Sequence, residues 1–182
     1  YQRFDGRSRA PSRLPSLQES AFRSAHGQPP QRPVRNAIGA NFRTDGPEDR
    51  PLSDRCLVGF NAGPPVNPSF YNNNLQIIQN RDHVAIIIEM VHDARIVPMG
   101  NRPHAAAEIG QWSGDSRGYW DGDSLVVETR NFNGLTNSFF ALGSSENKHL
   151  TERFTRVAND RIDYEFTIDD PSTFTDKIVG LI

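Results

Sequence analysis

Residues 71–171 contain short apolar segments separated by turn-forming residues, and this pattern constrains the fold more than any other feature of the chain. Several segments alternate apolar and polar side chains with a period of two, which is typical of half-buried antiparallel strands. None has the 3.6-residue period of an amphipathic helix. The pattern therefore predicts an all-β body of about seven strands.

The first predicted strand pair spans residues 75–79 and 83–90, with a turn at residues 80–82. Residues 84–88 are apolar at every position, which predicts a central strand that is covered on both faces. A third strand is predicted over residues 94–98, before a loop rich in proline and glycine.

Two hairpins are predicted further along the chain. Residues 118–120 and 124–132 flank Asp121-Gly122, a pair that favours a type I′ turn, in which both central residues have positive φ. Residues 149–157 and 161–168 flank the turn sequence Ala158-Asn159-Asp160. In 161–168 every second residue is apolar, which indicates a strand with one wet face. Residues 174–182 are expected to form an edge strand or an incomplete one.

Two architectures fit this order of strands. An up-and-down meander favours a calyx-like antiparallel barrel, and a β-sandwich is the alternative. A chain of 182 residues has the size of one ordinary domain. We therefore expect one β domain over residues 51–182 and an extended arm over residues 1–50.

The predicted arm differs from the body in charge and composition. Residues 1–50 carry nine Arg against five acidic residues, whereas residues 51–182 carry eleven Lys and Arg against seventeen acidic residues. The arm also holds six prolines and little apolar surface, so it needs a partner to become ordered. Only a turn or two of helix, near Ser16, is expected in it. The prediction is that it binds another protein chain, and the alternative is that it wraps the acidic body of its own chain. Nucleic acid is not expected as a partner, because the arm contains no Lys and the body has no basic and aromatic stripe.

Neither a transmembrane segment nor a disulfide is predicted. No apolar run approaches the roughly 20 residues that a spanning helix needs. The chain begins at Tyr1 without a basic and apolar leader, which we interpret as a soluble protein or a processed form. The one cysteine, Cys56, is expected to be a small buried apolar residue, with a reactive thiol as the alternative.

Six segments between residues 46 and 157 resemble those of a broad group of exported bacterial proteins of uncharacterised function. They are GPEDRPL, YNNNLQI, EMVHDARI, GNRPH, QWSGDSRGYWDGDSLVVETRNF and ERFTRV. The resemblance covers about residues 46–176 and excludes the arm. It implies a bacterial protein of the periplasm or the extracellular space, and it assigns no catalytic residue.

One candidate site lies at the end of the most apolar predicted strand. Its residues are Glu89, His92, Asp93 and Arg95, with His104 on the following loop. If these side chains converge, they suit a divalent metal or an acid and base pair. The alternative, which we favour, is an ion-pair network that closes one end of the barrel. We predict no metal and no cofactor.

A second candidate site consists of Trp112, Asp115, Arg117, Tyr119 and Trp120. Trp112, Arg117 and Trp120 are candidate ligand-binding residues, because aromatic rings beside Asp115 and an arginine can stack on a sugar or another planar ligand. The alternative assigns Trp120 to stabilising the hairpin and Asp115 and Arg117 to a local ion pair.

Glu152 is predicted to point into the core, on the same strand face as Leu150 and Phe154. A buried carboxylate is costly unless it is paired. Arg153 or Arg130 is the expected partner if the strand contains a bulge. The sequence does not indicate a glycoside-cleaving pair of carboxylates.

The motifs of common enzyme classes are missing from the sequence. It contains no phosphate-binding glycine loop, no nucleophile elbow and no Cys/His nucleophile spacing. The leading expectation is therefore a non-enzymatic, exported accessory subunit that is anchored in a larger assembly by its arm. The alternative is a small-molecule-binding or carbohydrate-binding protein, or an enzyme, that uses the cluster from Glu89 to His104.

Overall fold

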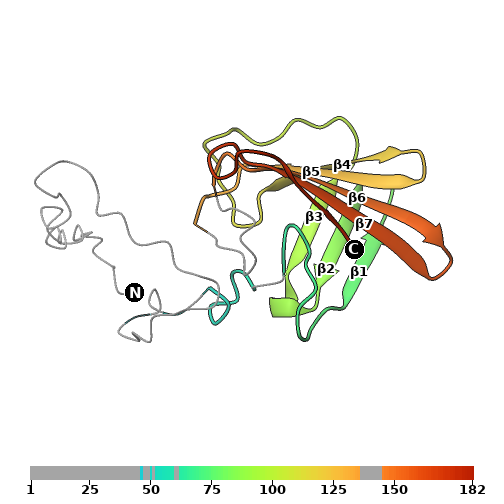
Figure 1. Cartoon of the computed structure of the whole chain (residues 1–182), viewed down its shortest axis with the longest axis horizontal. Coiled ribbons are helices and arrows are strands. Elements are labelled where there is room, and N and C mark those ends of the chain that lie inside the picture. The colour runs from blue at the N-terminus through green and yellow to red at the C-terminus, as the bar shows by residue number, and fades with distance from the viewer. Residues whose placement is uncertain (1–45, 47–49, 51, 60–61, 136–144) are drawn as a thin grey trace, which may run out of the picture. The chain divides into compact units, whose positions relative to one another are not determined.

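The computed structural model describes residues 46, 50, 52–59, 62–135 and 145–182. Within them the chain forms eight β-strands and one short 3-10 turn, Met90–His92. The strands make two antiparallel sheets, so the all-β prediction is confirmed (Figure 1). Of the arm predicted over residues 1–50, only Gly46 and Arg50 are described. The predictions for the arm, including the short helix, lie outside the described residues.

The smaller sheet has three strands in the order β1-β2-β3: Leu75–Gln79, His83–Ile88 and Ala94–Pro98. The bounds of β1 and β3 are those predicted from the sequence. β2 ends earlier than predicted because the chain turns away from the sheet at Met90–His92 before it enters β3.

β2 is the central strand of this sheet, as predicted. Its even-numbered residues are buried, whereas Ala85 and Ile87 are only half-buried. Ile78 and Ile96, which pair with Ala85 from either side, are 49% and 57% exposed. The described residues therefore cover one face of the sheet, which corrects the prediction that both faces are covered. A sheet in a two-layer stack has only one face against the core.

The larger sheet has five strands in the order β4-β5-β6-β7-β8: Asp115–Asp121, Ser124–Arg130, His149–Ala158, Arg161–Asp169 and Ile178–Leu181. Neighbours in the sequence are neighbours in the sheet, which is the predicted meander. The edge strand expected near the C-terminus is β8. Tyr164, Phe166 and Ile168 of β7 are buried, as the period of two predicts.

The β4–β5 turn is displaced by one residue from its predicted place. Asp121 pairs directly with Ser124, so the turn residues are Gly122 and Asp123. Gly122 has a φ of 58°, but Asp123 does not have a positive φ, which excludes the predicted type I′ turn. The β6–β7 hairpin is confirmed with a shorter turn, because Ala158 belongs to β6 and pairs with Arg161. A register shift between Arg156 and Ala158 marks a bulge there.

The two sheets touch along β3 and β4. Met99 forms a β-bridge with Gly118, and the amide of Gly100 donates to the carbonyl of Gly118 at 2.9 Å. A Cβ atom at position 118 would lie 2.7 Å from the Met99 sulfur and 2.9 Å from a methyl group of Val97. The missing side chain at Gly118 thus permits the close approach of the two sheets on this side.

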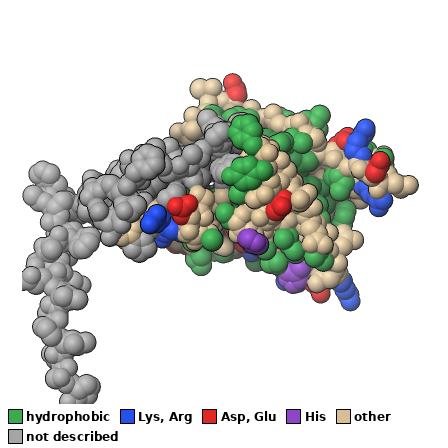
Figure 2. All heavy atoms as spheres, turned by 90° about the horizontal axis from the view of Figure 1, so that it is seen from below, with side chains coloured by type: hydrophobic (Ala, Val, Ile, Leu, Met, Phe, Trp, Pro, Cys, Tyr) green, Lys and Arg blue, Asp and Glu red, His purple; other side chains and the backbone are tan. Residues whose placement is uncertain are grey.

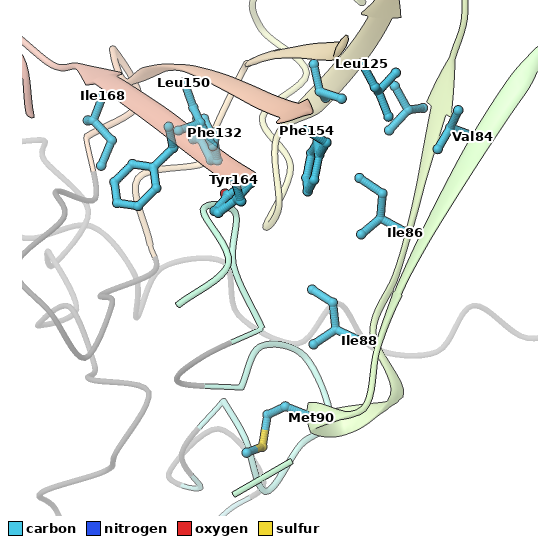
Figure 3. Packing of buried hydrophobic residues seen from close by; sticks show 13 residues of the cluster. Val84, Ile86, Ile88, Met90, Leu125, Phe132, Leu150, Phe154, Tyr164 and Ile168 are labelled. Carbon is cyan, nitrogen blue, oxygen red and sulfur yellow. The ribbon is translucent and has the colours of Figure 1, made fainter. Parts of the chain in front are cut away.

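The sheets enclose one hydrophobic core. In Figure 3, Ile86 and Ile88 point from β2 toward Phe154 and Tyr164 of the larger sheet, and all four are buried. In the described part of the chain no β-bridge joins β1 to β7 or β8. The barrel is therefore not closed, and the arrangement is a sandwich with one open side.

Candidate ligand-binding cleft

Three large apolar side chains on the inner face of the larger sheet are about half exposed. They are Trp120, Ile162 and Ile182, at 53%, 51% and 52%. Trp120 pairs with Leu125, which pairs with Phe154, and both of these partners are buried. The three exposed residues thus face the same side as the core, yet the described residues leave them uncovered. They lie beside a cleft between the sheets.

The cleft has an inner compartment of about 260 Å³. Leu75, Ile77 and Ile88 line it from the smaller sheet, and Phe154, Ile162 and Tyr164 line it from the larger one. Asparagines and Pro68, from the loop before β1, complete its rim. The compartment is therefore a mainly apolar space that opens on the side where the barrel is not closed.

An outer compartment of about 690 Å³ lies next to the first. The two compartments share the lining residues Ile77, Phe154 and Ile162, so they lie side by side between the sheets, and we refer to them together as the cleft. The outer compartment adds one large aromatic residue and three polar ones: Trp120, Gln79, Asp123 and Arg156. The combined volume of the two compartments lies in the range of small-molecule sites, about 300–1,000 Å³.

A buried polar network supports the wall of the inner compartment. Tyr164 Oη donates to Glu152 Oε1 at 2.7 Å and accepts from the amide of Val66 at 3.0 Å. Arg95 donates to both carboxylate oxygens of Glu152 from the other sheet. Burial raises the pKa of the Tyr164 phenol, and the charge of Glu152 raises it further. The phenol thus stays protonated and holds its place in the network.

Glu152 points inward as predicted, but its partner is neither Arg153 nor Arg130. Arg153 donates to Asp121 at 2.6 Å, and Arg130 donates to His149 at 3.2 Å. The expected bulge occurs in β6, but between Arg156 and Ala158, where it does not turn either arginine inward. The carboxylate is instead paired by an arginine of the facing sheet.

Within the first predicted cluster, the charges of Asp93 and Arg95 act on each other. Arg95 binds Glu152, whereas the carboxylate of Glu89 accepts from Asn74 at 2.9 Å. Burial raises the pKa of the Asp93 carboxyl. His92 lies in the 3-10 turn with a φ of 56°. None of these residues lines the cleft, and their binding role stays a prediction.

His104 belongs to the second predicted site instead. Its Nδ1 lies 3.1 Å from Asp115 Oδ2, and Arg117 donates to Asp115 Oδ1 at 2.5 Å. Arg117 also donates twice to the carbonyl of Pro103. Burial acts to raise the pKa of the Asp115 carboxyl, but hydrogen bonds from Ala105 and Arg117 outweigh this effect, so the pKa is lowered. These contacts fasten the loop after β3 to β4, which fits the predicted local ion pair.

The two tryptophans of the second site lie apart. Trp120 lines the outer compartment, whereas Trp112 is half-buried in a turn near the Gln111–Phe132 bridge and lines neither compartment. Tyr119 is exposed on the opposite face of β4. Of the aromatic residues proposed from the sequence, Trp120 is thus the one at the cleft.

Sequence reasoning missed Ile77, Phe154, Ile162 and Arg156 as site residues. The alternation in β7 marks Ile162 as inward-facing, but an inward position normally means a core residue. Only the separation of the sheets along one side makes these positions accessible. On the face shown in Figure 2, hydrophobic side chains lie among charged and polar ones, so exposed apolar groups alone do not mark the site.

Among the described residues, no group of three or more His, Cys, Asp or Glu side chains is arranged to hold a metal ion. They include no helix that is long and apolar enough to cross a membrane.

Cys56 is exposed in a turn with a φ of 52°, which corrects the prediction that it is buried. Cys56 precedes the first strand, outside the two packed sheets.

Comparisons with protein-family models, curated proteins and solved structures give no match for this chain. The resemblance to exported bacterial proteins therefore stays a prediction. The cleft is accordingly interpreted from its own geometry.

Proposed function

We propose that this protein binds a small, largely apolar molecule in the cleft between its two sheets. The observation that carries the proposal is the half-exposure of three inward-facing side chains, Trp120, Ile162 and Ile182. Removing apolar surface from water contributes about 25 cal/mol of favourable free energy per Å². A ligand that fills the cleft would complete the core on the open side, and this gain favours binding.

The cleft has the mixture of surfaces that small-molecule sites use. Its inner compartment is apolar, and a few polar groups stand at the rim of the outer one. The Tyr164 network holds the larger sheet, the smaller sheet and the loop at Val66 together. Walls that are fixed before binding reduce the entropy lost when a ligand enters.

A titration of the full chain with N-phenyl-1-naphthylamine tests this proposal. The probe is neutral, and its fluorescence increases in an apolar environment. Substituting Ile162→Asn should weaken binding about tenfold, because it places an amide on the surface shared by both compartments. The matched control is Ile96→Asn, on the outer face of the smaller sheet, where the side chain is 57% exposed, close to the 51% of Ile162. It should leave the affinity unchanged.

Absence of saturable binding to the folded wild-type protein would refute the proposal. Equal weakening by Ile162→Asn and Ile96→Asn would also refute it, since that result assigns the probe to exposed apolar surface in general. Circular dichroism and thermal melting of both variants separate a lost site from a lost fold.

The role as an exported accessory subunit is a separate proposal. It rests on residues 1–50, of which the structure describes only Gly46 and Arg50, and on the resemblance to exported bacterial proteins. Co-purification of the full chain with partner proteins, compared with a variant that lacks residues 1–45, tests it. Loss of partners from the truncated but folded protein is the expected result.

A further inference from the structure

We propose that the ligand of the cleft is an amphipathic anion. Its apolar body occupies the inner compartment, and its carboxylate, sulfonate or phosphate head lies beside Arg156. This inference rests on the proposed binding function and specifies the chemical class of the ligand.

Arg156 lines the outer compartment, next to residues that line both compartments. It lies two residues after Phe154 on the same face of β6, and it pairs directly with Ile162 of β7. Phe154 and Ile162 both line the inner and the outer compartment. A ligand that packs against these two side chains would therefore place its outer end next to the guanidinium group.

The guanidinium is held in place by main-chain carbonyls. Arg156 Nε donates to the carbonyl of Ala158 at 3.2 Å, and Nη2 donates to that of Asn159 at 3.0 Å. These bonds orient the group but do not neutralise its charge. Arginine can offer further N–H groups to an anion in a planar fork.

Other arginines of this hairpin differ from Arg156 in their partners. Arg153, on the opposite face of β6, forms an ion pair with Asp121 at 2.6 Å. Arg161 forms one with Asp163 at 3.2 Å. Among the described residues no carboxylate forms an ion pair with Arg156. Among the three arginines of the β6–β7 hairpin, Arg156, which lines the outer compartment, is thus the one without an ion pair.

Asp123 also lines the outer compartment, and it precedes Ser124, which pairs with Thr155, the residue before Arg156. Asp123 belongs to the β4–β5 turn, and the nearest inward-facing residue along β5 is Leu125, which lines the outer compartment only. Asp123 thus lies near Arg156 across the ends of β5 and β6, but no ion pair between the two is found among the described residues. Arg156 pairs with Ile162, which lines both compartments, and it carries N–H donors for an anion, so it is the better placed of the two to bind the head group.

Two fluorescent probes that differ by one sulfonate group test this inference. N-phenyl-1-naphthylamine is neutral, and 8-anilinonaphthalene-1-sulfonate adds one sulfonate to the same ring system. With the full chain, Arg156→Gln should weaken the affinity for the anionic probe about fivefold and leave the affinity for the neutral probe unchanged. Arg156→Lys keeps the charge and should retain most of the preference for the anion. Decanoate should displace the probes more strongly than decanol.

The matched control is Arg153→Gln, which removes the same charge from the outer face of the same strand. It should change neither affinity, and Asp123→Asn should not weaken the anionic probe. Equal effects of Arg156→Gln on both probes, or no effect on either, would overturn the anion inference while the cleft proposal stands. If neither probe binds the folded wild-type protein, both proposals fail.

Discussion

Arg95 and Glu152 form an ion pair across the core, with Arg95 on β3 of the smaller sheet and Glu152 on β6 of the larger one. Nη1 and Nη2 donate to Oε2 and Oε1 at 2.5 and 3.0 Å, and both side chains are buried. The bidentate geometry satisfies both carboxylate oxygens, and Tyr164 donates a third hydrogen bond. The pair fixes the position of one sheet relative to the other beside the cleft.

Removing one member of this pair should destabilise the protein more than removing both. Glu152→Leu leaves the Arg95 charge buried without its partner, which costs about 3–5 kcal/mol of unfolding free energy. Arg95→Met combined with Glu152→Leu should cost less, because no unpaired charge remains. Urea denaturation measures both values. A double variant that is less stable than either single one would show that the pair itself is strongly stabilising.

Tyr164→Phe should lower the unfolding free energy by about 1–3 kcal/mol. The variant keeps the ring but removes the hydroxyl that donates to Glu152 and accepts from the Val66 amide. That amide should then exchange its hydrogen faster, which hydrogen exchange detects. Tyr119→Phe, at an exposed position, is the control. If the two variants are equally stable, the hydroxyl contributes nothing to the packing.

The strand order was readable from local sequence, whereas the site was not. Alternation and turn residues locate β1, β3 and the β6–β7 hairpin, because these signals act between neighbours in the chain. The same alternation shows that Glu152 points inward. Its partner Arg95 is distant in the sequence and lies on the facing sheet, so only tertiary packing identifies the pair.

The cleft was hidden from the sequence for a related reason. Ile162 has the pattern of a core residue, and whether an inward-facing side chain is buried depends on the separation of the sheets. Gly118 lets the sheets approach at β3 and β4, but on the opposite side no such contact forms among the described residues. The accessible inner surface follows from this difference.

His149 should make stability depend on pH in the acidic range. Burial lowers its pKa below the ordinary value of 6.5, and the charge of Arg130 lowers it further. Its Nε2 accepts from Arg130 Nε at 3.2 Å, which requires the neutral ring. Below 6.5 the unfolded chain binds a proton that the folded one does not, so stability falls as the pH drops toward the folded pKa.

His149→Gln should reduce this loss of stability, since an amide oxygen can accept from Arg130 without titrating. Urea denaturation of both proteins between about pH 7 and about pH 5 measures the difference. Parallel curves for the wild type and the variant would show that other groups cause the acid sensitivity.

Lys148 should make stability depend on pH in the alkaline range. Burial lowers its pKa to about 8, although the charges of Asp170 and Glu152 act in the other direction. Its ammonium group lies 4.0 Å from the centre of the Phe132 ring. Above pH 8 the folded protein releases this proton, whereas the unfolded chain keeps it up to about 10.5. Stability should therefore rise with pH within this window.

Between about pH 8 and about pH 10 the rise amounts to about 2–3 kcal/mol, since each pH unit contributes about 1.4 kcal/mol. The prediction ends at about pH 10, because there a tyrosine of the unfolded chain begins to ionise, while Tyr164 keeps its proton in the folded state. Above this pH, Tyr164 makes stability fall and masks the effect of Lys148. Lys148→Met should remove the rise, and Lys177→Met, at an exposed position, should retain it. Urea denaturation across the window decides the matter, because a rise that survives in Lys148→Met cannot come from Lys148.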